Sequence, residues 1–131
     1  MNETDRKEIV RYRLSRAHDT LREVNILIEN QLWNTAVNRM YYACYYAVIA
    51  LLVSNEIKAQ THTGVRQMFG LHFVKKGIVD KEFGRYYSKI FDKRQTGDYD
   101  DFIDYNKEDV LALFKPATEF ISEIDKLIKT E

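Results

Sequence analysis

The chain has 131 residues, 45% hydrophobic and 31% charged, which is enough to enclose one hydrophobic core and is typical of a soluble globular domain. Lys and Arg together number 20, and Asp and Glu together also number 20, so the net charge is zero. This excludes a protein that attracts nucleic acid through a positive net charge. The single cysteine, Cys44, excludes an intrachain disulfide, and no apolar signal segment follows the charged N-terminus. We therefore expect one cytoplasmic domain over residues 1–131, without a membrane partner.

Two long helices are predicted in the first part of the chain. In residues 5–29, apolar residues recur three and four positions apart with charged residues between them, which indicates an amphipathic helix. Residues 33–53 contain no Gly or Pro and are apolar around most of the helix, which predicts a buried central helix. Its two apolar lines are Ala36, Met40, Ala43, Ala47 and Leu51, and Val37, Cys44, Val48 and Leu52. The short connection predicts that the two helices are antiparallel neighbours. The longest apolar stretch, 43–53, is too short to span a bilayer.

Two shorter helices are predicted next. The first covers residues 62–76, with Thr61 or Thr63 as its N-cap and Gly77 as its C-terminal stop. The second begins near Asp80 and ends at about Arg94. We expect a loop over residues 97–106 after it.

A last helix is predicted over residues 107–129. Asn106 and Asp109 have the spacing of a capping box at its start. The apolar pattern continues in phase across Pro116, which predicts one kinked helix rather than two helices. No segment alternates as a strand does, so we predict an all-α, up-and-down bundle of about five helices. The five glycines are scattered and no Cys/His spacing suits zinc, so we predict no cofactor and no metal.

Arg39 and His62 are the first candidate site residues. Arg39 lies in the central helix beside a group of tyrosines that includes Tyr42. It could pair with a carboxylate at the edge of the bundle, or face a phosphate in a cleft while Tyr42 stacks on a base. His62 could form a hydrogen bond that caps a turn, or act in acid–base chemistry near neutral pH.

A second group of candidates lies at the end of the fourth predicted helix. There the sequence reads Lys-Arg-Gln-Thr-Gly-Asp-Tyr, with Arg94, Asp98 and Tyr99 close together. Arg94 and Asp98 could pair across a glycine turn at Gly97. Alternatively, the turn presents Arg94 beside a carboxylate and a phenol at one mouth of the bundle.

The pattern Asn-Arg-x-Tyr-Tyr-Ala-x-Tyr-Tyr-Ala in residues 38–47, followed by His62 and by Arg-x-x-x-Asp-Tyr in residues 94–99, resembles the HEPN superfamily. In particular it is similar to a small uncharacterised branch with the Arg-x-x-x-Asp-Tyr ending. The resemblance covers nearly the whole chain. It implies a helical bundle, a two-fold homodimer, and a nucleotidyltransferase partner in a toxin–antitoxin or defence pair.

The resemblance also implies an activity and a site. Many members are metal-independent ribonucleases that use an Arg followed four to six residues later by a His. Here Asp98 and Tyr99 follow Arg94, and no His comes after them. The site implied comprises Arg94, Asp98 and Tyr99 as catalytic candidates, and Arg39, Tyr42 and His62 as contacts to a nucleotide or RNA. The alternative hypothesis is a non-catalytic scaffold or protein-interaction module whose Arg–Asp–Tyr cluster is structural.

Overall fold

The computed structural model describes residues 1–99 and 103–129, except for the side chain of Tyr99. The described chain contains five α-helices and no strand, which confirms the all-α prediction. The helices are α1 (Glu3–Glu29), α2 (Trp33–Ser54), α3 (His62–Phe69), α4 (Lys81–Tyr99) and α5 (Lys107–Lys129), and a π-helical segment η1 (Gly70–Val74) continues α3.

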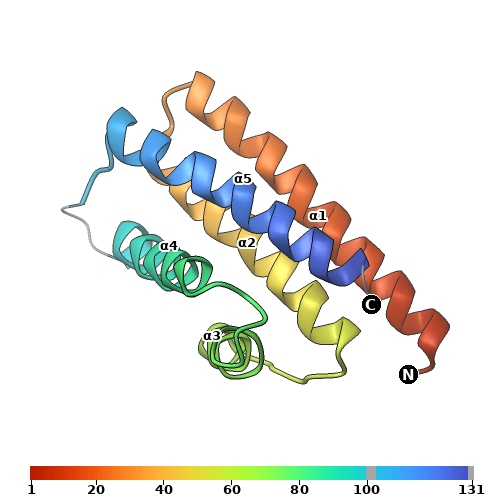
Figure 1. The fold of residues 1–131 in the computed structure, drawn as a ribbon. Coiled ribbons are helices and arrows are strands. Elements are labelled where there is room, and N and C mark those ends of the chain that lie inside the picture. Colours follow the sequence, from red (N-terminus) through yellow and green to blue (C-terminus); the bar gives the residue numbers. More distant parts are fainter. Residues whose placement is uncertain (100–102, 130–131) are drawn as a thin grey trace.

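Helix α2 lies at the centre of the bundle, in contact with α1, α3, α4 and α5 (Figure 1). All nine residues of its two predicted apolar lines are buried. Its alanines Ala36, Ala43, Ala47 and Ala50 are completely buried. Within the described residues, α2 is also the helix that is long and apolar enough to cross a membrane by length and composition, although 61% of its most apolar window is buried inside the bundle.

Helices α1 and α2 are antiparallel neighbours, as the short connection predicted, and α5 runs beside them so that both termini lie at one end of the molecule (Figure 1). The buried face of α1 consists of Val10, Ala17, Thr20 and Val24. Tyr12 lies outside this face and is 59% exposed.

The segment from α3 to α4 follows the predicted boundaries with one change. Thr61 caps α3, since its hydroxyl accepts a hydrogen bond of 2.8 Å from the Gly64 amide. The predicted helix of residues 62–76 is α-helical only as far as Phe69 and then widens into η1. Gly77 has φ of +75°, the left-handed conformation that ends a helix most easily at glycine.

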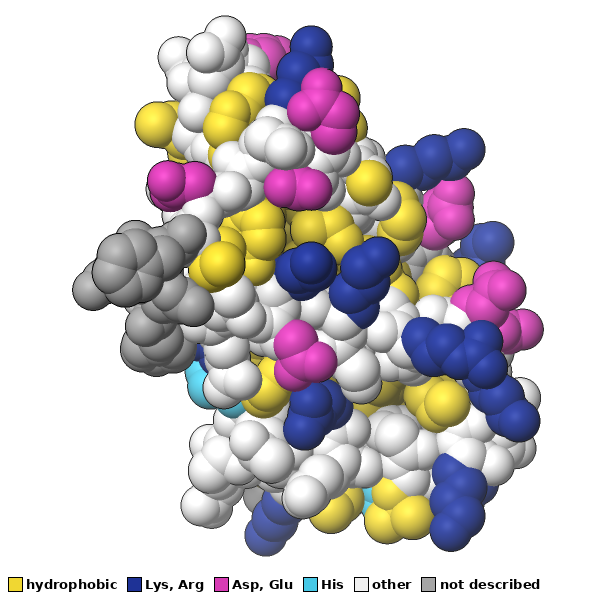
Figure 2. Space-filling view, turned by 90° about the vertical axis from the view of Figure 1, so that its left-hand side faces the viewer, with side chains coloured by type: hydrophobic (Ala, Val, Ile, Leu, Met, Phe, Trp, Pro, Cys, Tyr) yellow, Lys and Arg dark blue, Asp and Glu magenta, His cyan; other side chains and the backbone are white. Residues whose placement is uncertain are grey.

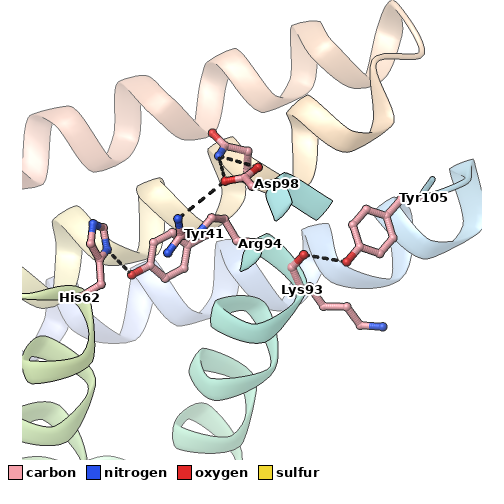
Figure 3. Close-up of polar contacts among 7 residues, drawn as sticks. Tyr41, His62, Lys93, Arg94, Asp98 and Tyr105 are labelled. Atoms are coloured by element: carbon pink, nitrogen blue, oxygen red, sulfur yellow. Dashed lines mark hydrogen bonds and ion pairs between the residues drawn. The ribbon is translucent and has the colours of Figure 1, made fainter. Parts of the chain in front are cut away.

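The prediction that the fourth helix ends at Arg94 is wrong, because α4 continues through Gly97 to Tyr99. A Cβ atom at position 97 would lie 3.0 Å from Cε2 of Tyr105. The glycine therefore allows the Tyr105 ring to approach the helix closely and does not form a turn. The Tyr105 hydroxyl donates a 2.6 Å hydrogen bond to the carbonyl of Lys93, which holds the ring there (Figure 3).

Helix α5 begins at the predicted capping box and is one helix rather than two. The amide of Asn106 donates to Asp109 Oδ2 at 3.1 Å and the amide of Asp109 donates to Asn106 Oδ1 at 2.9 Å, which forms the reciprocal capping box. The helix is one element that contains Pro116. The helix packs mainly against α2, and its buried apolar residues are Val110, Leu113, Ala117, Phe120, Ile121 and Ile124.

Candidate functional site

Arg94 and Asp98 lie one turn apart on α4 and form an ion pair on the side that faces α2 (Figure 3). Arg94 Nη1 is 3.6 Å from Asp98 Oδ2, and the two side chains are 7% and 30% exposed. The Asp98 carboxylate also accepts hydrogen bonds of 3.0 and 3.3 Å from Asn38 Nδ2 on α2. Asp98 therefore positions the guanidinium, and the pairing occurs along a helix rather than across a turn.

The Arg94 guanidinium rests against aromatic rings of α2. Its central carbon is 4.8 Å from the ring centroid of Tyr41 and 5.9 Å from that of Tyr42. Such cation–π contacts offset part of the cost of removing the charge from water. Nε of Arg94 is buried and has no hydrogen-bond partner among the described residues.

Tyr41 links this cation to His62 at the start of α3. The Tyr41 hydroxyl is 2.7 Å from His62 Nδ1 (Figure 3). The imidazole also stacks on the Tyr45 ring, with the two centroids 4.3 Å apart. Burial raises the pKa of Tyr41 to about 12, so this phenol stays protonated at neutral pH. His62 is partly exposed, and its Nε2 forms no hydrogen bond with a described residue.

The electrostatic environment keeps the His62 imidazole neutral. Burial lowers the pKa of His62 below its ordinary value of 6.5, and the positive charge of Arg94 lowers it further. A neutral imidazole near pH 7 can accept a proton. No group of three or more His, Cys, Asp or Glu residues placed to hold a metal ion occurs in the described part of the chain.

Four of the six predicted site residues come together in this cluster: Tyr42, His62, Arg94 and Asp98. Arg39 lies beside it, with its central carbon 5.1 Å from the Tyr42 ring centroid. Its Nε is 4.0 Å from Glu23 Oε2 of α1, which matches the expected carboxylate pairing at the bundle edge. The side chain of Tyr99 lies outside the described residues. Arg94 and Arg39 thus do not share one open cleft, because Arg94 is nearly buried whereas Arg39 faces α1.

The sequence prediction missed Asn38 and Tyr41 as members of the cluster. Both belong to the Asn-Arg-x-Tyr-Tyr segment, three residues apart and therefore on one face of α2. Their partners, Asp98 and His62, lie on other helices. The polar spacing could have suggested a shared face, but only the packing of α3 and α4 on α2 shows what these side chains bind.

Comparison with known proteins identifies the class of protein that this bundle represents. The family model described as "HEPN domain" matches residues 10–127, and the chain belongs to this family. A UPF0332 protein of Thermotoga maritima is 38% identical over 98% of this chain and 96% of its own length. Two proteins of Methanocaldococcus jannaschii, each named "Putative toxin", are 32% identical, over 88% and 95% of this chain and 78% and 92% of their own lengths.

Proposed function

We propose that this HEPN-domain protein binds RNA in the cytoplasm and acts as the toxin-like member of a two-protein system. The observation that carries the proposal is the cluster in which Arg94, Tyr41 and His62 converge from three helices. Two relatives that match most of this chain carry the name "Putative toxin", which supports the toxin-like role. The family resemblance supports a homodimer and a nucleotidyltransferase as the second protein of the pair.

The cluster offers the two kinds of contact that single-stranded RNA requires. Tyr42 and Tyr45 are only partly buried, and aromatic faces of this kind stack on bases irrespective of sequence. Arg94 places a positive charge close to the Tyr41 and Tyr42 rings, and Arg39 places a second one close to the Tyr42 ring. A base on Tyr42 would therefore bring its phosphate near positive charge.

The same cluster supplies an imidazole although no His follows Arg94 in the sequence. We extend the proposal to metal-independent cleavage of RNA, in which His62 acts as the general base that the family motif His would otherwise supply. His62 accepts the proton of the ribose 2′-hydroxyl, O2′ forms a bond to phosphorus, and the P–O5′ bond breaks. The leaving O5′ takes up the proton that His62 has accepted from the 2′-hydroxyl. Arg94 stabilises the negative charge that develops on the phosphate oxygens.

One observation favours the alternative of a non-catalytic scaffold. Arg94 is only 7% exposed and is paired with Asp98, as expected for a structural network. In that alternative the cluster would fix α4 on α2, and the protein would act by binding another protein.

Cleavage of a mixed RNA pool in excess EDTA tests the proposal. The variants are Arg94→Lys, His62→Gln and, as a matched control that removes an imidazole outside the cluster, His72→Gln. We expect the wild type and His72→Gln to cleave RNA equally, and His62→Gln to be slower by about 100-fold or more, the range of a lost general acid–base. Equal cleavage by all variants would indicate a contaminant. Folded wild-type protein that neither binds nor cleaves RNA would support the scaffold alternative.

A further inference from the structure

A groove with a basic rim lies between η1 and α4, away from the Arg94 cluster. It has a volume of about 710 Å³, and Lys75, Lys81, Arg85 and Lys89 line it. Val74 and Gly84 are also in its lining. A Cβ atom on residue 84 would lie 3.0 Å from both Cγ atoms of Val74, so the two segments are in direct contact there. Because Gly84 has no side chain, η1 packs directly on α4 at this point, between the cations that line the groove.

The positive charge of this groove is not neutralised within the protein. Lys75, Lys81, Arg85 and Lys89 are exposed, and none of them forms an ion pair with another described residue. The carboxylate in the lining, Asp92, is paired with Arg66 of α3 at 3.7 Å. On the face of the molecule that Figure 2 shows, Lys and Arg side chains lie across the centre and right-hand part, with Asp and Glu side chains among them. Since the whole chain has no net charge, this is a local feature.

The cations of α4 form a row rather than a point. Lys81, Arg85 and Lys89 are four residues apart, so successive side chains project from one face of the helix at intervals of about 6 Å. A row of this kind follows the backbone of a polynucleotide, whereas a single phosphate would need converging groups. Grooves that bind single strands combine such a basic path with aromatic rings on which bases stack.

The groove and the Arg94 cluster are joined through α3. Arg66 pairs with Asp92 at the end of the groove and packs over the Phe91 ring, with its central carbon 4.3 Å from the ring centroid. His62 precedes Arg66 by one helical turn, on the same face of α3. These contacts place Arg66 between the Asp92 end of the groove and His62, so a strand that leaves the groove past Asp92 is directed towards His62.

We propose that this groove binds the phosphate backbone of single-stranded RNA and directs the strand towards Tyr42 and His62. The inference rests on the proposed function and extends it, because it names a second contact region for the same substrate. The charge of the groove and its continuity with the aromatic cluster favour RNA over an acidic segment of a partner protein.

The test measures binding of a fluorescent single-stranded RNA to the full-length chain by anisotropy, between about 50 and 200 mM salt. The groove variant combines Lys81→Gln, Arg85→Gln and Lys89→Gln. The matched control removes three exposed cations of α5 by Lys115→Gln, Lys126→Gln and Lys129→Gln. Polyglutamate serves as an acidic competitor.

We expect the groove variant to bind RNA at least about tenfold more weakly and to lose roughly 2 from the slope of log affinity against log salt, about 0.7 for each lost phosphate contact. The α5 control should lose much less. If both variants bind as the wild type does, the groove proposal fails while the proposed function stands. If the wild type binds no RNA, the proposed function fails, and binding of polyglutamate alone would assign the groove to an acidic protein segment and overturn the proposal.

Discussion

The hydroxyl of Tyr41 and Nδ1 of His62 lie 2.7 Å apart, although one residue is in the middle of α2 and the other begins α3. The Tyr41 ring also carries the guanidinium of Arg94 at 4.8 Å from its centroid. Tyr41 is fully buried, so its position is fixed, and it fixes in turn the orientation of the His62 imidazole and the position of the Arg94 guanidinium. The chemistry proposed for His62 and Arg94 therefore depends on a residue that reaches neither solvent nor substrate.

Tyr41→Phe keeps the ring and removes only the hydroxyl. We expect it to lower the free energy of unfolding by about 1 kcal/mol, the net value of one hydrogen bond, because His62 loses its partner. Chemical denaturation measures the change. Tyr12→Phe is the control, since Tyr12 is 59% exposed and its substitution should leave stability unchanged. Equal stability of wild type and Tyr41→Phe would show that the hydrogen bond contributes nothing.

Removing the charge of Arg94 should raise the pKa of His62. Burial is the larger cause of the lowered pKa and remains in Arg94→Gln, so the pKa should move towards 6.5 without reaching it. Titration of the imidazole protons by NMR measures the shift, with Arg85→Gln as a control that removes a cation elsewhere on α4. A His62 pKa that is the same in Arg94→Gln and wild type would contradict the electrostatic link.

The same shift predicts how stability depends on pH in the acidic range. Because the pKa of folded His62 is below 6.5, the unfolded chain takes up this proton first as the pH falls. The contribution of His62 to stability is therefore present above about pH 6.5 and decreases below it. Denaturation at a series of pH values should show a steeper acidic decline in the wild type than in His62→Gln.

In the alkaline range, Tyr41 should lower stability as the pH rises. Its pKa is about 12 in the folded protein against an ordinary 10.0, so the unfolded chain releases this proton first. The free energy of unfolding should therefore decrease as the pH rises from 10.0 to about 12, and the decrease should be less steep in Tyr41→Phe. Burial also raises the pKa of Tyr86 and Tyr87, so phenolate absorbance should appear in part only when the protein unfolds. Reversible ionisation of every tyrosine in the folded state would contradict this.

Gly97 and Gly70 should respond in opposite directions to alanine. Gly97→Ala places Cβ 3.0 Å from Tyr105 Cε2, and displacing this ring should cost more than the helix propensity gained. No atom lies within 4 Å of a Cβ at position 70, so Gly70→Ala should raise stability by up to about 1 kcal/mol. Thermal unfolding of both variants measures the difference. Greater stability in Gly97→Ala would show that the ring accommodates the methyl group.

The fold was largely predictable because its signals are local. The apolar periodicity of α2 and α5 and the capping pair Asn106 and Asp109 depend on neighbours in the sequence, and the structure confirms them. The error at Gly97 arose because a helical glycine and a helix-ending glycine look alike in sequence. The Tyr105 ring that requires the glycine is eight residues away, and Asn34 of α2 holds its segment by bonding to Ile103 and to the Tyr105 amide.

The site was predictable only in part because its contacts run between helices. Arg94, Asp98 and His62 could be selected by residue type, whereas the contribution of Tyr41 and Asn38 depends on how α3 and α4 pack on α2. Charge composition was uninformative for a similar reason. Equal total numbers of acidic and basic residues do not reveal that cations lie in a row on α4. This row borders a groove only because η1 lies beside α4 in the folded protein.

Photo-crosslinking of a single-stranded RNA that contains 4-thiouridine, followed by mass spectrometry of the attached peptides, shows whether RNA binds at the Arg94 cluster. We expect crosslinks on the partly exposed aromatic residues of α2, Tyr42 and Tyr45, and on His62 at the start of α3. Excess unlabelled RNA should abolish them. Crosslinks confined to other helices, or none with folded protein, would contradict an RNA site built on Tyr41, His62 and Arg94.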